Sequence, residues 1–233
     1  MQGHQLPLLI PSDPAYDAAE FLPDGSNEAA RTWLGRTEVW PDRRLALWGG
    51  ADRGKTHLLH IWATSTEAEI MDGHALDGVP VIASPSGVAI DHADRADEHA
   101  LLHLLNTARD LGRPVLLAGR GPPARWPVTL SDLASRLRAI TAVEVGLPDD
   151  DLLRRLLLRW LAERRLVADE ALHDRLLTYL PRSPDILRAA VLRLDRDALV
   201  SRRRKVTPGM LRAALSGEPA DDNSEKLTPP PPG

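Results

Sequence analysis

The chain has 233 residues, of which 43% are hydrophobic and 27% are charged. This length and composition can bury a core in one large domain or two small ones. A formal net charge of −4 argues against a free-standing DNA-binding protein, and the absence of cysteine excludes disulfides, thiolate catalysis and cysteine-ligated zinc. There is no apolar run of about 18 residues and no basic-then-apolar N-terminus, so we expect no membrane span, no secretory signal and a cytoplasmic location.

Residues 1–14 are rich in proline and apolar side chains but have no helical or strand period, which predicts an extended N-terminal arm. From 15 to 147, short apolar runs alternate with helical stretches. Buried strands are predicted at 45–50, 87–91 and 114–119, and helices at 55–63 and 97–112. Strands separated by helices indicate parallel βαβ units, so the predicted fold is α/β, with a parallel sheet flanked by helices.

The pattern changes after Pro148. Residues 148–217 are predicted to form a small all-helical domain punctuated by prolines. Its expected helices are at 149–166, 168–180, 184–200 and 207–216. The tail at 218–233 ends in TPPPPG and is predicted to be disordered.

The most specific motif directly follows the first predicted strand. Eight residues fit G-x-x-x-x-G-K-[ST], the pattern of a phosphate-binding loop: Gly49, Gly50, Ala51, Asp52, Arg53, Gly54, Lys55 and Thr56. Glycines let backbone N–H groups point at a phosphate, and the helix that follows adds its positive N-terminal end. Lys55 would reach the β- and γ-phosphates and Thr56 would hold Mg²⁺. An incidental turn is the alternative, but a strand before and a helix after favour a nucleotide site, which also includes His57.

A second acidic position follows a buried strand. Asp91 ends the run Val88-Ala89-Ile90-Asp91, where a carboxylate would hold Mg²⁺ through water; an ordinary helix cap is the alternative. Many P-loop ATPases continue with an acidic residue that polarises the attacking water, but here His92 follows. An imidazole can act as a base near neutral pH, yet it is not the usual choice. Slow or absent intrinsic hydrolysis is therefore expected.

These segments resemble one protein family. The resemblance runs from about residue 5 to 215, and its most specific parts are the phosphate loop, the arm and the segment PPARWPVTLSDLASRL at 122–137. Together they are similar to the bacterial DnaA-related AAA+ proteins, and most of all to their short Hda branch, which inactivates the replication initiator DnaA. The resemblance implies an AAA+ base domain, a helical lid, bound ADP or ATP with Mg²⁺, and DnaA as partner.

The arm carries a second family feature. Gln5, Leu6, Pro7, Leu8 and Leu9 are similar to the short peptide by which replication proteins dock on the DNA polymerase sliding clamp. An extended peptide that orders on binding suits this role, because its glutamine offers an amide and its leucines fill an apolar groove. The alternative is that the arm packs on its own domain.

The resemblance also assigns an arginine. Arg136 occupies the place of the family's arginine finger, which faces the γ-phosphate of a neighbouring subunit and neutralises charge in the transition state. The alternative is an arginine that braces its own helix. The chain ends after the helical region, so no sequence-specific DNA binding of its own is expected, and the sequence leaves open whether it forms a homodimer.

Three positions depart from the family pattern. His92 replaces an acidic residue, Ala118 stands near the place of a polar γ-phosphate sensor, and Asp185 stands where a lid arginine usually touches the nucleotide. Arg182 or Arg188 would have to substitute for that arginine, although neither is at the matching helical step. An aspartate repels a triphosphate, so the predicted protein binds ADP, or binds nucleotide weakly, and acts on ATP held by DnaA.

Other functions are also compatible with these residues. The chain could be an active AAA+ ATPase of the initiator or helicase-loader type, or a degenerate scaffold that only binds the clamp. A small-molecule P-loop kinase is disfavoured by the separate four-helix region.

Overall fold

The computed structural model describes residue 16 and residues 18–216. The predicted clamp-binding peptide, residues 5–9, and the predicted tail, 218–233, therefore lie outside the described residues. Five strands form one parallel sheet in the order β2-β3-β4-β1-β5. They are β1 (Arg44–Trp48), β2 (Glu69–Asp72), β3 (Val88–Asp91), β4 (Val115–Gly119) and β5 (Thr141–Glu144).

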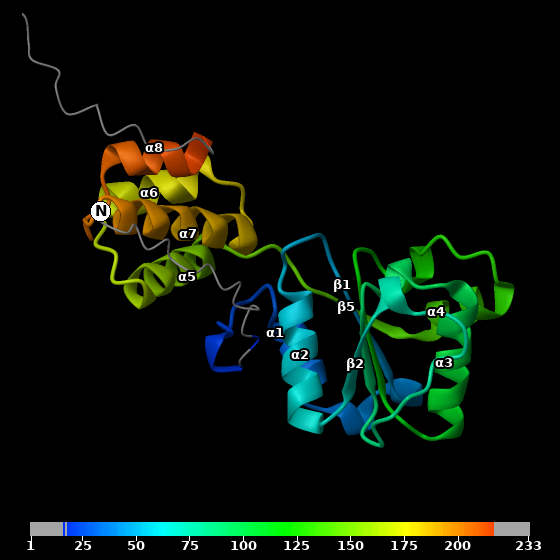
Figure 1. Cartoon of the computed structure of the whole chain (residues 1–233). Helices are drawn as coiled ribbons and strands as arrows, with labels where there is room; N and C mark the ends of the chain where they lie inside the picture. The colour runs from blue at the N-terminus through cyan, green and yellow to red at the C-terminus, as the bar shows by residue number, and fades with distance from the viewer. Residues whose placement is uncertain (1–15, 17, 217–233) are drawn as a thin grey trace, which may run out of the picture.

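Helices cover both faces of the sheet, which confirms the predicted parallel α/β arrangement (Figure 1). On one face lie α1 (Glu28–Leu34) and α2 (Lys55–Thr66), and on the other lie α3 (Glu98–Asp110) and α4 (Ser131–Ala139). Side chains alternate along each strand, so Leu45 and Leu47 contact the α1–α2 layer and Ala46 contacts the α3–α4 layer. Burial on both faces explains why these strands are nearly continuous apolar runs.

Short 3₁₀ turns connect several of these elements. They are η1 (Ala18–Glu20), η2 (Thr37–Val39), η3 (Pro41–Arg43), η4 (Gly73–Ala75), η5 (Ala93–Arg95) and η6 (Pro123–Arg125).

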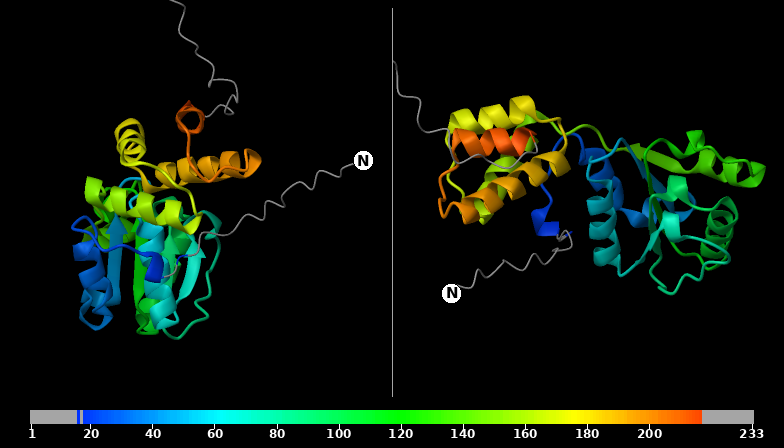
Figure 2. Two further views of the ribbon diagram at one scale, coloured as in Figure 1. Left: turned by 90° about the vertical axis from the view of Figure 1, so that its left-hand side faces the viewer. Right: turned by 45° about the horizontal axis from the view of Figure 1, so that its top comes forward.

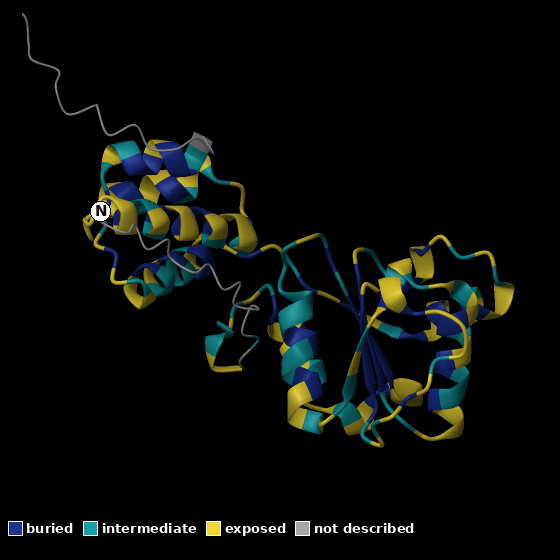
Figure 3. Cartoon of the chain, in the orientation of Figure 1, coloured by how far each residue is buried: buried dark blue, intermediate teal, exposed yellow. Residues whose placement is uncertain are grey.

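Four further helices follow the sheet and have a core of their own. They are α5 (Asp150–Glu163), α6 (Glu170–Tyr179), α7 (Pro184–Val200) and α8 (Pro208–Ser216), called here the C-terminal helices. Their apolar faces meet around fully buried Leu157, Leu176 and Val191, beside the sheet layers (Figures 2 and 3). The predicted helical ranges at 149–216 are confirmed to within a few residues. The division into two domains at 147 and 148 stays a prediction.

Side-chain caps explain why three of these helices begin where they do. Asp149, Asp169 and Ser183 each accept a hydrogen bond from the backbone N–H three residues ahead. Such caps satisfy donors that the first helical turn leaves without partners. Proline then occupies the first position of α7, where its missing N–H costs nothing.

Hydrogen bonds join the C-terminal helices to the rest of the chain. From α5, Arg155 Nη2 donates to the Pro23 carbonyl and Arg159 Nη1 donates to the Ala19 carbonyl, both at 3.1 Å. Just before α7, Ser183 Oγ donates to Asp52 Oδ2 at 2.8 Å. The residues around η1 and the loop after β1 therefore both contact the C-terminal helices. None of the helices in the described part of the chain is both long and apolar enough to cross a membrane.

Truncating a core leucine of the sheet should destabilise the protein strongly. Leu117 in β4 is fully buried, so Leu117→Ala removes buried methyl groups and leaves a cavity. Chemical denaturation should show a loss of about 2–5 kcal/mol in the free energy of unfolding. Leu111→Ala is the matched control, because 53% of Leu111 is already exposed, and its effect should stay within about 0.5 kcal/mol. Equal losses for both variants would contradict the described core.

Candidate nucleotide-binding site

The loop from Gly49 to Thr56 joins β1 to α2 at the carboxyl edge of the sheet. A β-carbon on Gly49 would lie 2.5 Å from the Val145 carbonyl oxygen, so only glycine allows this approach. The loop is tied further to the end of β5, because Arg53 Nη1 lies 3.3 Å from Glu144 Oε1 and from the Val145 carbonyl oxygen. Gly54 then caps α2, whose first N–H groups open toward the loop.

Lys55 lies folded into this loop. Its Nζ donates to the Gly50 carbonyl at 2.6 Å, which places an ammonium group beside backbone donors. Burial lowers the pKa of Lys55, while the nearby carboxylates of Asp91 and Asp94 act in the opposite direction. The partly desolvated Lys55 ammonium is bonded to a neutral carbonyl, and an anionic phosphate in place of that carbonyl would give it a stronger interaction.

Thr56, in the first turn of α2, meets Asp91 at the carboxyl end of β3. Thr56 Oγ1 donates to Asp91 Oδ2 at 2.7 Å, and the His92 N–H donates to Asp91 Oδ1 at 2.9 Å. Asp91 is therefore held in one orientation, with its side chain only 12% exposed. A hydroxyl and a carboxylate are the oxygen ligands that Mg²⁺ accepts, directly or through water, so this pair fits that ion.

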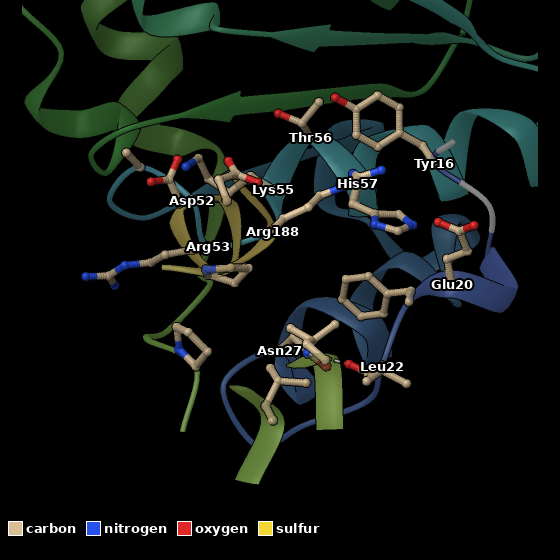
Figure 4. A pocket seen from close by; sticks show the side chains of 18 of the residues that line it. Tyr16, Glu20, Leu22, Asn27, Asp52, Arg53, Lys55, Thr56, His57 and Arg188 are labelled. Carbon is tan, nitrogen blue, oxygen red and sulfur yellow. Dashed lines mark hydrogen bonds between the residues drawn. The ribbon is translucent and has the colours of Figure 1, made fainter. Parts of the chain in front are cut away.

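A cavity of about 760 Å³ lies between the loop, the residues around η1 and the C-terminal helices. In Figure 4, Asp52 and Lys55 lie on one side of it, Tyr16 and His57 lie together on the other, and the Arg188 side chain extends between the two sides. The wall therefore changes from charged at the loop to aromatic farther away.

The aromatic side of the cavity is built on α2. The Tyr16 ring stacks on His60 with centroids 4.1 Å apart, and both Tyr16 and Phe21 contact His57 edge-on. Burial lowers the pKa of His60, so its ring is neutral near pH 7 and suits stacking. This side could accept a flat apolar group, while the loop accepts an anion.

Two carboxyl groups meet where α7 contacts the loop. Asp52 accepts the hydrogen bond from Ser183, and the Asp185 carboxyl lies within hydrogen-bonding reach of Asp52. Burial raises the pKa of Asp185, the neighbouring Asp52 raises it further, and Arg188 acts in the opposite direction. The loop and α7 thus bring negative charge to the mouth of the cavity.

The positions that depart from the family pattern divide into two groups. His92 and Asp185 line the cavity, and so do Arg188 and Arg120, which are not among those positions. Ala118 does not; it is fully buried within the sheet. Arg182 is turned away into an ion pair with Asp150 at 2.9 Å, so Arg188 is the arginine of α7 that reaches the cavity.

Arg136 lies outside the residues that line this cavity. Its guanidinium donates two hydrogen bonds to Asp132, each at 3.2 Å, and 19% of its side chain is exposed. It lies near Arg44, whose pKa is lowered first by burial and then by the charge of Arg136. Any contact of Arg136 with a triphosphate would therefore involve another molecule's nucleotide.

Known proteins share this fold at low sequence identity. No protein-family model and no curated protein matches the chain at a significant level. Domain III of the replication initiation protein DnaA from Thermotoga maritima aligns with a TM-score of 0.71 and 17% identity, over 89% of this chain and 98% of that domain.

Two longer proteins align less completely. AMPPCP-bound DnaA from Aquifex aeolicus gives a TM-score of 0.62 at 17% identity, over 77% of this chain and 65% of that one. The RuvB Holliday junction branch migration motor of Thermotoga maritima gives a TM-score of 0.62 at 19% identity, over 82% of this chain and 66% of that one. The chain therefore has the fold of AAA+ P-loop proteins, and it spans about two thirds of these longer structures.

Many residues that line the cavity were not predicted from the sequence, and Tyr16, Phe21 and Asp94 are three of them. Tyr16 and Phe21 lie in a segment without a strong period, and Asp94 lies in a short turn after β3. No motif marks them, because they reach the cavity only through the packing of η1 and η5 against the loop.

Removing the Asp185 carboxylate should stabilise the protein near neutral pH. Because the folded state raises the pKa of Asp185, it binds more protons than the unfolded state above pH 3.8, and stability falls as pH rises through this range. Asp185→Asn removes that penalty, so its melting temperature should exceed the wild type at pH 7 and approach it near pH 4. The residue as a whole is solvent-exposed although its carboxyl group packs against Asp52, so screening limits the gain to about 3 °C.

The control for this prediction is Asp77→Asn, which changes an exposed aspartate outside the cavity. Its melting temperature should follow that of the wild type at every pH. A lower melting temperature for Asp185→Asn at pH 7 would show that the Asp185 carboxylate stabilises the contact instead.

Proposed function

We propose that this chain is a DnaA-related regulator of chromosome replication initiation that binds ADP or ATP with Mg²⁺ in the cavity. The observation that carries the proposal is the phosphate loop, where Lys55 and the Thr56–Asp91 pair lie at one end of a cavity with aromatic residues at the other. An adenine nucleotide has two corresponding parts, an anionic phosphate chain and a flat adenine ring. The DnaA structures that share this fold include one bound to AMPPCP.

In this proposal the C-terminal helices are the lid of an AAA+ module. Arg188 from α7 would contact the phosphates, and the Ser183–Asp52 hydrogen bond would hold the lid on the loop. The nearby Asp185 favours a diphosphate, because a γ-phosphate would add like charge beside Asp52 and Asp185. Bound ADP would then act as a structural element, with weak or absent hydrolysis.

The proposed chemistry takes place in the partner. Gln5, Leu6, Pro7, Leu8 and Leu9 would dock on the sliding clamp, and Arg136 would face ATP bound to DnaA. To do so, Arg136 must leave Asp132, a partly exposed i,i+4 pair of a kind that contributes only about 0.3–0.5 kcal/mol. Breaking this pair costs little compared with the gain from an arginine finger, which raises the rate of hydrolysis by a factor on the order of 10³–10⁵.

Removing the loop lysine should weaken nucleotide binding. Lys55→Ala deletes a charge-assisted bond to phosphate, so the Kd for a fluorescent ADP analogue should rise by about 10- to 100-fold. Lys205→Ala is the matched control, since Lys205 is exposed and lies outside the cavity. Unchanged binding by Lys55→Ala would contradict the site.

The regulatory role is tested by mixing the chain with DNA-loaded sliding clamp and ATP-bound DnaA, and measuring ADP formation. The wild type should stimulate hydrolysis, and both Arg136→Ala and Gln5→Ala should return it to the rate of DnaA alone. Arg138→Ala, an exposed arginine on the same helix, is the control and should stimulate fully.

The same assay distinguishes the other readings. Full stimulation by Arg136→Ala would exclude the finger, and a chain that binds the clamp without stimulating DnaA would be a scaffold. Rapid ATP turnover by the chain alone, lost in Lys55→Ala, would identify an active AAA+ ATPase of the initiator or helicase-loader type.

A further inference from the structure

Three side chains with metal-binding atoms meet beside the nucleotide cavity, at the carboxyl ends of β2 and β3. Asp72 Oδ1 lies 3.0 Å from His74 Nδ1 and 3.3 Å from His92 Nδ1. Each residue offers one ligand atom, and all three atoms lie within 4.8 Å of one another. Within residue 16 and residues 18–216, this is the one group of three or more His, Cys, Asp or Glu residues with that spacing.

The backbone that carries these residues is tightly constrained. Asp72 and Asp91 are paired in neighbouring parallel strands, so the residues that follow each strand lie side by side. A β-carbon on Gly73 would lie 2.2 Å from the His92 carbonyl oxygen, so no other residue permits this approach. His92 itself has a φ of +50°, which is uncommon for a residue with a side chain. Both features bring His74 and His92 to the same carboxylate.

The ligand set defines the kind of ion. Two imidazole nitrogens and one carboxylate oxygen suit Zn²⁺ and related first-row ions, whereas Mg²⁺ prefers oxygen ligands only. Tetrahedral zinc with bonds of about 2.0–2.1 Å separates its ligand atoms by roughly 3.3 Å. The distances from Asp72 Oδ1 to the two rings already match this spacing.

The rings need only small movements to complete the site. Their centroids are 4.7 Å apart and their planes are tilted by 54°. The side chains of Asp72, His74 and His92 are 55%, 57% and 46% exposed, so each can rotate without disturbing the core. The simpler explanation is that both rings hydrogen-bond to one carboxylate oxygen, but the same arrangement is also what a metal-free form of such a site would adopt.

We propose that Asp72, His74 and His92 bind one divalent transition-metal ion of the Zn²⁺ class, with at least one position left for water. The site is distinct from the Thr56–Asp91 pair, although His92 directly follows Asp91. The bound ion would hold His92 next to Asp72, and Asp91 would keep its hydrogen bond from Thr56. The proposal does not depend on the identity of the nucleotide or on DnaA.

The test uses the full chain without a histidine tag, stripped of metal by dialysis against a chelator. Titration calorimetry with Zn²⁺ should give one equivalent per chain, and Co²⁺ should give the visible absorption of a nitrogen- and oxygen-ligated ion. Asp72→Ala, His74→Ala and His92→Ala should each weaken binding at least about tenfold. His74→Gln and His92→Gln retain polar side chains, and circular dichroism checks that every variant is folded.

The sharpest control is a second histidine pair. His99 and His103 are exposed and one turn apart on α3, so they are the main rival for a zinc ion. Their double alanine variant should bind Zn²⁺ like the wild type. Loss of binding in this control, or wild-type binding in the folded His74 and His92 variants, would overturn the proposal, as would displacement of Zn²⁺ by millimolar Mg²⁺.

Discussion

The candidate site depends on β1 being an inner strand of a parallel sheet. β1 is paired with β4 on one side and with β5 on the other, so its carboxyl end cannot shift relative to either. The Val145 N–H donates to the Trp48 carbonyl at 2.8 Å, and the Gly49 N–H donates to the Gly119 carbonyl at 3.3 Å. The phosphate loop thus starts from a point fixed on both sides. A loop held in this way loses little conformational entropy when a ligand binds.

Charge at this site is mixed rather than uniformly positive. Lys55, Arg120 and Arg188 favour an anion, while Asp52 and Asp185 at the contact with α7 oppose it. Two unit charges 4 Å apart near a protein surface interact by about 1–4 kcal/mol, depending on the local dielectric. That is enough to change the preference between a diphosphate and a triphosphate, which is why the proposal gives the C-terminal helices a role in nucleotide choice.

Sequence reasoning could find the elements that carry long patterns or a strict motif. The phosphate loop, the inner strands β1, β3 and β4, and the C-terminal helices were all predicted because their apolar runs or caps are unambiguous. The strands β2 and β5 were missed because both lie at the edges of the sheet and are mostly half-buried or exposed, whereas β3, also four residues long, is buried throughout. Short, partly exposed strands carry too weak a pattern to stand out.

Contacts between distant segments could not be predicted from the sequence either. Whether Arg182 or Arg188 faces the cavity depends on the rotation of α7, which the Ser183 cap and the core fix together. The group formed by Asp72, His74 and His92 depends on the pairing of β2 with β3, and β2 was not predicted. Tyr16 reaches His60 next to η1, which a hydrogen bond from Arg159 holds against α5.

The central claim is that one nucleotide contacts both the phosphate loop and α7. Amide hydrogen exchange with and without Mg·ADP tests it directly, because it reports each segment separately. Amide exchange should slow on nucleotide addition in residues 50–57 and also in 183–188, with no change in α3. Unchanged exchange in the loop, or protection of the loop without any in α7, would contradict the shared site.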